Sequence, residues 1–231
     1  MIKVISFKIC PFVQRVTALL EAKSIPYEID FISLKDKPQW FLDISPTGQV
    51  PVLIAKDGTP LFESDAIIEY VDEISEPLET DLTPEAKALN RAWSYQASKH
   101  YLVQCSAMRS PDEETLAERS ANLGKAFAKA EKQLGDGPYF SGNTIGNVDI
   151  AWLVLLHRTE IIRKETGYDF LAGYSKVQAW REALMKTGLA EKSVAEDFEQ
   201  SFTDFYLSDK TFLGTGGNCA VPRNEPCGPC C

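Results

Sequence analysis

Two spacings of hydrophobic residues alternate along residues 1–75. Runs of β-branched and aromatic residues predict strands at 3–7, 25–31, 50–55 and 60–62. Apolar residues three and four positions apart predict helices at 11–23, 37–44 and 64–74. Pro11 suits the first turn of a helix, where its missing N–H is not needed, and Ser64 is placed as an N-cap. The order β-α-β-α-β-β-α predicts a compact α/β domain with a sheet of mixed direction.

Beyond a polar stretch that carries Pro77 and Pro84, only helical spacing remains. It predicts helices at 85–108, 112–134, 147–166, 175–187 and 190–206. We therefore expect an α/β domain at 1–75, a linker at 76–84 and an all-α domain at 85–207. Residues 208–231 are expected to form a flexible tail, because Gly, Pro and Cys dominate its sequence and large apolar residues become rare.

Composition and charge narrow the classes of function. The chain has 231 residues, of which 44% are hydrophobic and 25% charged, as in an ordinary globular protein. Its net charge of −9 argues against nucleic acids and anionic membrane surfaces as main partners. No apolar run approaches the roughly 18 residues of a membrane-spanning helix, and no targeting segment is recognisable. We therefore expect a cytoplasmic protein.

The six cysteines do not form a disulfide framework. Four of them, Cys219, Cys227, Cys230 and Cys231, fall in the tail. They leave open an oxidisable tail, a soft-metal site, a partner thiol for Cys10 or lipidation. Only Cys10 and Cys105 lie in the body, and no cluster there has the spacing of metal ligands, so no metal is expected.

Cys10 follows the first strand and opens the first helix. Unpaired N–H groups and the helix dipole favour an anion at that place, so its thiol is expected to be acidic and nucleophilic. Val13 stands where a Cys-x-x-Cys motif would have its second cysteine, so an external thiol would have to resolve an intermediate. The alternative is that Cys10 is a small, buried apolar residue.

Several motifs occur in order around this turn. They are Cys10-Pro11-Phe12, the stretch 33–46 with Lys37-Pro38-Gln39-Trp40, Gly48-Gln49-Val50-Pro51-Val52 and Phe62-Glu63-Ser64. Together they resemble the cysteine-type glutathione transferases: the omega and lambda classes and the plant dehydroascorbate reductases. The resemblance covers residues 1–75, and it implies a thioredoxin-like N-terminal domain followed by an all-α domain.

The resemblance also implies a glutathione site. Pro51 would be a cis-proline, and the Val50 backbone would pair with the cysteinyl part of glutathione. Glu63 and Ser64 would hold the γ-glutamyl ammonium and carboxylate. Lys37 would face the glycyl carboxylate. Phe12 and Leu34 would line the same groove. Without the resemblance, Ser64 is simply an N-cap, Lys37 a surface lysine and Pro51 an ordinary strand-start proline.

The implied function is a glutathione-dependent thiol transferase and dehydroascorbate reductase that works through a Cys10–glutathione mixed disulfide. The alternatives are a conjugating transferase and a non-enzymatic binding protein. A homodimer is expected from the family. His100 and His157 are interpreted as structural, and Tyr101, Cys105 and Met108 as packing residues near a possible acceptor site. Asp149 is interpreted as a folding residue, although Gly146 replaces the Ser or Thr that the family usually has three residues before it.

Overall fold

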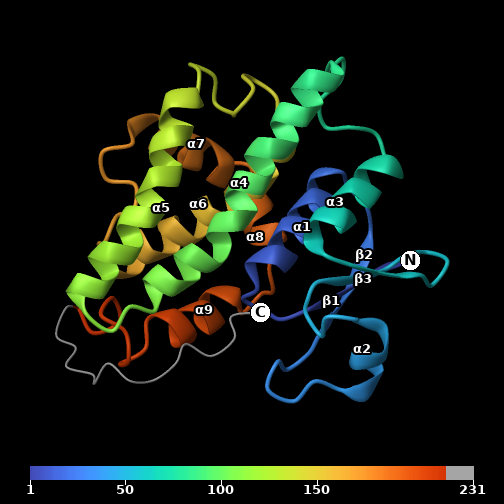
Figure 1. The fold of residues 1–231 in the computed structure, drawn as a ribbon, viewed down its shortest axis with the longest axis horizontal. Coiled ribbons are helices and arrows are strands. Elements are labelled where there is room, and N and C mark those ends of the chain that lie inside the picture. The colour runs from blue at the N-terminus through green and yellow to red at the C-terminus, as the bar shows by residue number, and fades with distance from the viewer. Residues whose placement is uncertain (217–231) are drawn as a thin grey trace.

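A mixed four-stranded sheet forms the N-terminal part of the chain, in a computed structural model that describes residues 1–216 (Figure 1). Its strands are β1 (Ile2–Ser6), β2 (Tyr27–Phe31), β3 (Val52–Ile54) and β4 (Pro60–Phe62), in the order β2-β1-β3-β4. Strand β1 runs parallel to β2 and antiparallel to β3, and β3 is antiparallel to β4. The predicted sheet of mixed direction is therefore confirmed.

Helices cover both faces of this sheet. Figure 1 shows α1 (Pro11–Ala22) and α3 (Ser64–Glu73) on one side and α2 (Gln39–Ile44) on the other. Helix α1 is buried along most of its length, including its polar residues Gln14, Arg15 and Thr17. A surface helix would expose such residues. Their burial follows from the position of α1, which lies between the sheet and the helical part of the chain.

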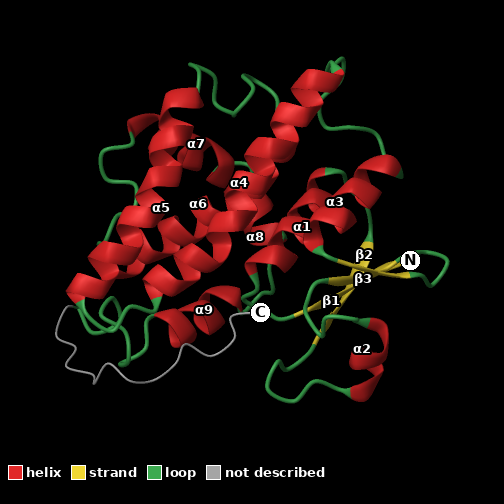
Figure 2. Cartoon of the chain, in the orientation of Figure 1, coloured by secondary structure: helices red, strands yellow, loops and turns green. Residues whose placement is uncertain are grey.

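The remaining helices form an all-α part, and Figure 2 shows the strands gathered at the opposite side of the molecule. These helices are α4 (Pro84–Met108), α5 (Glu113–Gln133), α6 (Asn147–Thr166), α7 (Ser175–Met185), α8 (Leu189–Lys192) and α9 (Phe198–Tyr206). Helix α6 is central, and Trp152 on it packs against the rings of Phe127 and Trp180. The expected thioredoxin-like sheet domain followed by an all-α domain is thus the fold observed. No helix within residues 1–216 combines the length and the apolarity needed to cross a bilayer.

The single helix predicted at 190–206 is wrong, because the chain there forms two helices, α8 and α9. The reason lies in Ser193. Its carbonyl accepts a hydrogen bond of 2.6 Å from the Thr17 hydroxyl of α1, and its own hydroxyl donates to the carbonyl of Ala190 at 2.9 Å. The hydrogen bond from Thr17 thus takes the carbonyl of Ser193 that a continuous helix would use. It also holds the end of α8 against the N-terminal domain.

The body of the fold also extends further along the chain than the sequence indicates. Residues 208–216 were assigned to the tail, yet Thr211 and Leu213 are buried and the N–H of Phe212 donates to the carbonyl of Ser110 at 2.8 Å. Leu213 supplies the apolar burial that the Gly- and Pro-rich composition obscures. The cysteines at 219, 227, 230 and 231 lie outside the described residues. Pro84, predicted as part of the linker, opens α4 behind the N-cap Thr83.

The start of α6 is held by Asp149, as predicted. One of its carboxylate oxygens accepts the N–H of Gly146 at 2.9 Å. The other accepts the N–H of Phe140 at 2.9 Å and the indole N–H of Trp180 at 2.6 Å. A Cβ at position 146 would overlap the carboxylate of Glu79. Glycine therefore replaces the usual N-cap residue at a place where the Glu79 side chain fills the space.

Candidate active site

The strand register gathers the predicted site at one edge of the sheet. Ile5 pairs with Val52, and Val52 pairs with Phe62. Ser6 pairs with Phe31 on the other side of β1. The turn after β1, the loop after β2, the segment before β3 and the start of α3 therefore lie side by side. These four segments carry Cys10, Leu34 and Lys37, Val50 and Pro51, and Glu63 and Ser64 respectively.

Cys10 occupies the N-cap position of α1, and Pro11 is the first residue of the helix, as predicted. The N–H of Cys10 donates to the carbonyl of Phe7 at 3.0 Å, and its carbonyl accepts the N–H of Gln14 at 3.2 Å. The first N–H groups of a helix have no acceptor within the helix and point toward the cap. The sulfur is therefore carried at the positive end of α1, and the residue is only 1% exposed.

Phe12 connects this turn to the helical domain. Its ring meets the ring of Tyr101 edge to face at 5.2 Å between centroids. The Tyr101 hydroxyl donates to the carbonyl of Ala151 at 2.7 Å, and burial raises the pKa of this phenol well above its usual range. Tyr101 is therefore a protonated packing residue with an occupied hydroxyl. It lacks the geometry of a hydroxyl that activates a thiol.

The segment before β3 adopts the expected conformation: the Val50–Pro51 peptide bond is cis. Val50 and Pro51 are both buried. The ammonium of Lys37 donates to the carbonyl of Gly48 at 2.8 Å, so this lysine lies against the loop that leads into the cis bond. Leu34 is half-buried in the same loop as Lys37. The structure thus brings the positive charge of Lys37 to the predicted groove.

The N-cap at the start of α3 lies one residue earlier than the sequence-based prediction placed it. Glu63 is the N-cap of α3, and Ser64, which we predicted as the N-cap, is the first helical residue. The reason is the backbone of Glu63, whose φ of 66° lies in the left-handed region. A residue with a Cβ rarely adopts that conformation, and such outliers concentrate at binding sites. No side-chain hydrogen bond caps α3, so its first N–H groups remain available to an anion.

Helix α6 also reaches the Cys10 turn, through residues that our sequence analysis did not select. Arg158 is fully buried and donates from Nη2 to the carbonyl of Ile9 at 3.2 Å and from Nη1 to the side-chain oxygen of Gln14. The Gln14 amide nitrogen contacts Nδ1 of His157 at 2.9 Å and donates to the Ser193 hydroxyl at 3.3 Å. Polar residues at otherwise apolar positions of the helices at 11–23 and 147–166 are the signal that points to this network.

The two histidines take structural positions. Burial and the nearby guanidinium of Arg158 lower the pKa of His157 to about 3, so its ring is neutral near pH 7. Its Nδ1 is engaged by Gln14, and its ring stacks on Phe198 at 5.4 Å between centroids. His100 is bound to the carbonyl of Gln96 on its own helix at 2.6 Å. Neither arrangement provides a base for Cys10.

Cys105 and Met108 are fully buried in α4, which agrees with their interpretation as packing residues. The Tyr206 hydroxyl of α9 lies 3.1 Å from the Cys105 sulfur. Within residues 1–216, no three His, Cys, Asp or Glu side chains form a group able to hold a metal ion.

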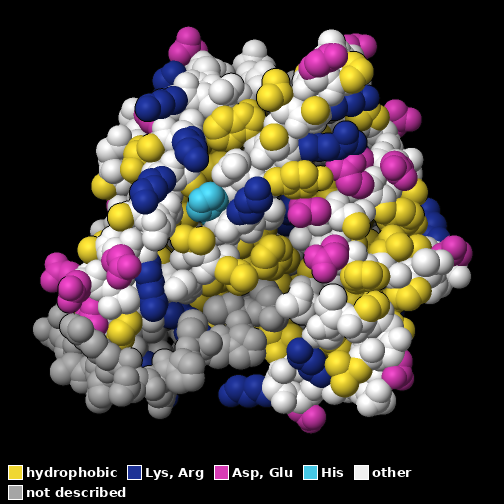
Figure 3. Space-filling view, viewed as in Figure 1, with side chains coloured by type: hydrophobic (Ala, Val, Ile, Leu, Met, Phe, Trp, Pro, Cys, Tyr) yellow, Lys and Arg dark blue, Asp and Glu magenta, His cyan; other side chains and the backbone are white. Residues whose placement is uncertain are grey.

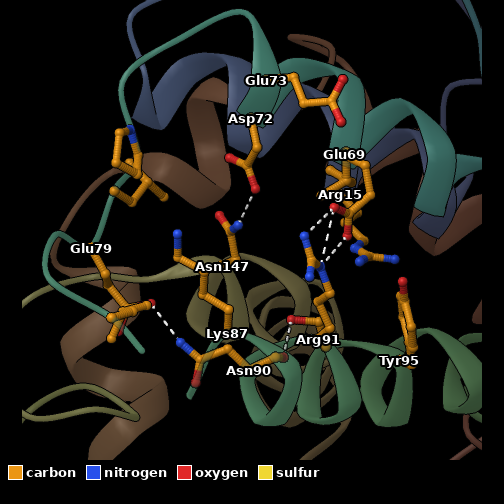
Figure 4. A pocket seen from close by; sticks show the side chains of 15 residues that line it. Arg15, Glu69, Asp72, Glu73, Glu79, Lys87, Asn90, Arg91, Tyr95 and Asn147 are labelled. Carbon is orange, nitrogen blue, oxygen red and sulfur yellow. Dashed lines mark hydrogen bonds and ion pairs between the residues drawn. The ribbon is translucent and has the colours of Figure 1, made fainter. Parts of the chain in front are cut away.

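Two cavities border the region. One of about 500 Å³ opens beside the Cys10 turn, between Phe7, Lys8, Phe31 and α9. The other, of about 360 Å³, lies between α3 and α4, and most of the side chains that line it are charged or polar (Figure 4). Across it, Arg91 binds the carboxylate of Glu69 with a shortest distance of 2.8 Å. The Arg91–Glu69 ion pair lies at the cavity between α3 and α4, whereas the cavity beside Lys8 is lined by Ile9, the residue before Cys10.

Comparisons with known proteins agree with this geometry. Residues 9–74 match a family model described as the glutathione S-transferase N-terminal domain, and residues 113–183 match one described as the C-terminal domain. A glutathione S-transferase omega-1 of Sus scrofa is 30% identical over 214 residues, covering 90% of this chain and 87% of the relative. A probable cytosolic glutathione S-transferase DHAR1 of Oryza sativa is 31% identical over 176 residues, covering 76% and 79%.

Solved structures give the same result. The crystal structure of glutathione transferase Omega 3C from Trametes versicolor superposes with a TM-score of 0.72 at 29% identity. The match covers 84% of this chain and 89% of that structure. The similarity therefore extends over both domains and is not confined to the Cys10 turn.

Proposed function

The chain belongs to the glutathione S-transferase superfamily, and from this premise we propose that it is a glutathione-dependent thiol transferase and dehydroascorbate reductase. Cys10 is its nucleophile, and a Cys10–glutathione mixed disulfide is its intermediate. The observation that carries the proposal is the position of Cys10 at the positive end of α1, on the sheet edge that also holds Lys37, Val50 and the start of α3. Relatives of the omega and DHAR classes support the same assignment.

The groove suits an anionic tripeptide although the chain is acidic. We assign the γ-glutamyl carboxylate to Ser64 and the uncapped N–H groups of α3, and its ammonium to the exposed carboxylate of Glu63. The Val50 backbone beside Pro51 pairs with the cysteinyl unit. Lys37 provides the charge for the glycyl carboxylate. Phe12 and Leu34 form the apolar wall of the groove.

The reaction follows from thiolate chemistry. Cys10 thiolate attacks a carbonyl carbon of dehydroascorbate and forms a thiohemiketal. A glutathione thiolate then attacks the Cys10 sulfur, so that ascorbate leaves with the two electrons of the C–S bond and takes up protons, and the mixed disulfide remains. A second glutathione thiolate attacks the glutathione sulfur of that disulfide. This step releases oxidised glutathione and regenerates the Cys10 thiolate.

One observation favours a second candidate, a binding protein without enzymatic activity. Cys10 is 1% exposed, as a packed apolar residue would be. The two candidates differ in whether glutathione reaches the sulfur. A conjugating transferase that depends on a tyrosine hydroxyl is disfavoured, because the hydroxyl of Tyr101 is bound to a backbone carbonyl.

Mass spectrometry after incubation with oxidised glutathione decides between these candidates. Trypsin cleaves after Lys8 and Arg15, so residues 9–15 form a peptide that contains Cys10 and no other cysteine. We expect an adduct of one glutathione on this peptide, and its loss in Cys10→Ser. Cys105→Ser is the matched control and is expected to retain the adduct. If the adduct forms only on tail peptides, Cys10 is not the nucleophile.

Assays of ascorbate formation and of mixed-disulfide reduction then rank the substrates. We expect Cys10→Ser to abolish both activities. If the Cys10 adduct forms but dehydroascorbate is not reduced, the thiol transferase assignment stands and the reductase assignment fails.

The acting form is proposed to be a cytoplasmic homodimer. Figure 3 shows Lys, Arg, Asp and Glu side chains together with apolar ones over the seam between α3 and the first half of α4. Phe62 on β4 is 40% exposed and Leu89 on α4 is 62% exposed, so large apolar side chains of both domains are available for a contact with a second chain. We expect light scattering to give twice the chain mass of 25.7 kDa. Leu89→Glu should give monomers, whereas Leu42→Glu on α2 should not. A monomeric wild-type chain would contradict the dimer.

A further inference from the structure

Arg158 is a buried cation whose hydrogen-bond acceptors among the described residues are all neutral. It is 0% exposed, and its guanidinium donates to the carbonyl of Val154 at 3.1 Å, the carbonyl of Ile9 at 3.2 Å and the side-chain oxygen of Gln14. Its Nε–H makes no hydrogen bond within residues 1–216. No carboxylate of the described residues lies within ion-pair distance of it.

The other buried arginines of the described residues each form an ion pair with a carboxylate. Arg181 on α7 is 5% exposed and lies 3.2 Å from the carboxylate of Glu160. Arg15 on α1 forms an ion pair with Asp65 of α3. Arg158 differs from both of them, although it is the most deeply buried of the three. An unpaired charge inside a protein costs several kcal/mol, so an anion close to Arg158 would be strongly stabilised.

The Cys10 thiol is placed to be that anion. Arg158 binds the carbonyl of Ile9, which directly precedes Cys10 in the chain. The charges of Arg158 and Cys10 also both act on the Tyr101 hydroxyl, with opposite effects on its pKa. The guanidinium and the sulfur therefore both lie within electrostatic range of the same buried phenol. Arg158, Cys10 and Tyr101 are each at most 1% exposed, so bulk solvent screens their charges only weakly.

The other charged groups around the turn do not replace Arg158. Arg15 also acts on Tyr101, but Asp65 neutralises it. Lys8, in the turn itself, lies 2.5 Å from the carboxylate of Asp197. His157, next to Arg158 on α6, is neutral near pH 7. Arg158 is thus the cation near Cys10 for which no carboxylate partner exists among the described residues.

We propose that Arg158 is the buried counter-charge of the Cys10 thiolate, delivered to the N-terminal domain by helix α6 of the helical domain. This inference rests on the proposed function, because it requires Cys10 to ionise as the nucleophile. Arg158 acts through the ionisation of Cys10 and through the Ile9 carbonyl, so it is a positioning residue. The helical domain thereby contributes directly to nucleophile formation.

The test measures the ionisation of Cys10 itself. The rate of alkylation by iodoacetamide is followed on the tryptic peptide 9–15 from about pH 4 to pH 10, for the full chain and its variants. We expect the wild-type midpoint to lie well below the 8.5 or so of an ordinary thiol. Arg158→Gln should raise this midpoint by about one unit or more. Arg158→Lys, which keeps the charge, should restore most of the shift. Arg181→Gln, the matched control at a buried arginine that is paired with Glu160, should leave the midpoint unchanged.

The outcomes separate the two proposals. A wild-type midpoint at or above that of an ordinary thiol overturns the proposed thiolate chemistry and this inference with it. A low midpoint that persists in a folded Arg158→Gln variant overturns the counter-charge alone. The same holds if Arg158→Lys shifts the midpoint as far as Arg158→Gln does, because the effect is then one of packing.

A second measurement needs no substitution of Arg158. The ¹⁵N resonance of its Nε should shift with pH at the Cys10 midpoint in the wild-type chain. It should be independent of that midpoint in Cys10→Ser. A resonance that does not move as Cys10 ionises overturns the proposal, even where Arg158→Gln fails to fold.

Discussion

Replacing Asp149 tests how hydrogen bonds and the cost of burial each contribute to the effect of a buried carboxylate on the free energy of unfolding. The side chain is 0% exposed and accepts three hydrogen bonds, from Gly146, Phe140 and Trp180. Asp149→Ala would leave all three donors without a partner. Each unsatisfied buried donor costs about 1–3 kcal/mol, so for three donors we expect the free energy of unfolding to fall by about 3–9 kcal/mol at pH 7. That is a large part of the roughly 5–15 kcal/mol of a typical domain.

The pH dependence of stability gives a sharper result. Burial raises the pKa of Asp149 to about 6, against the hydrogen bonds, which lower it. The folded chain therefore binds this proton more tightly than the unfolded chain, and the resulting stability is gained as the pH falls through 6. Asp149→Asn lacks the titrating group. Between pH 7 and about pH 5.5, the wild type should gain about 1 kcal/mol over this variant. The lower limit stays above the isoelectric point of about 4.9.

Urea unfolding followed by tryptophan fluorescence measures both effects. Asp57→Asn, at an exposed turn, is the control for a change of charge. If the wild type instead loses stability relative to Asp149→Asn on acidification, the reasoning is refuted, because the pKa of Asp149 would then be depressed. The hydrogen bonds to the ionised form would in that case outweigh its desolvation. A loss below about 1 kcal/mol in Asp149→Ala would refute the assignment of this carboxylate as the main support of the α6 start.

The remaining predictions concern the site and the contact between domains. Glu63→Gly should raise the free energy of unfolding in urea by up to about 1 kcal/mol, because a φ of 66° suits glycine. The same variant should bind glutathione more weakly in titration calorimetry, and an unchanged affinity would remove Glu63 from the site. Lys37→Ala should raise the KM for glutathione severalfold, whereas Lys35→Ala, an exposed lysine of the same loop, should not; equal effects would mean that only net charge matters. Thr17→Val should lower the free energy of unfolding by about 1–2 kcal/mol, because the carbonyl of Ser193 loses its donor; an unchanged midpoint in urea would contradict this role.

The sequence was informative wherever a feature depends on neighbours in the chain. The strand, the turn and Pro11 at a helix start are local, and they place Cys10 at the N-cap of α1. The mixed direction of the sheet followed from the order of the elements, whereas the strand order β2-β1-β3-β4 was known only from the structure. The motif at 48–52, read through the family resemblance, anticipated the cis bond before Pro51. Such features are encoded within a few residues and need no knowledge of distant partners.

The errors have the opposite origin. Spacing alone predicted a continuous helix at 190–206, because the apolar positions of α8 and α9 keep one helical period. The break depends on Thr17, which is 176 positions away from Ser193 in the chain. The role of Gln14 and Arg158 depends on a contact across 144 positions. A single sequence shows that these side chains are polar within apolar segments, but it does not show which of them meet.

The polar contact between the two domains has a physical meaning of its own. Replacing buried polar groups by apolar ones of similar size is often neutral or stabilising, so stability alone does not explain Gln14, Arg15 and Arg158 in a buried interface. Their bonds converge on the turn that carries Cys10 and on the start of α3. A purely apolar interface would hold the domains together equally well, but it would leave the turn without directional support and the proposed thiolate without a cation. On the proposed mechanism, these polar residues serve the ionisation of Cys10, which lies where the domains meet.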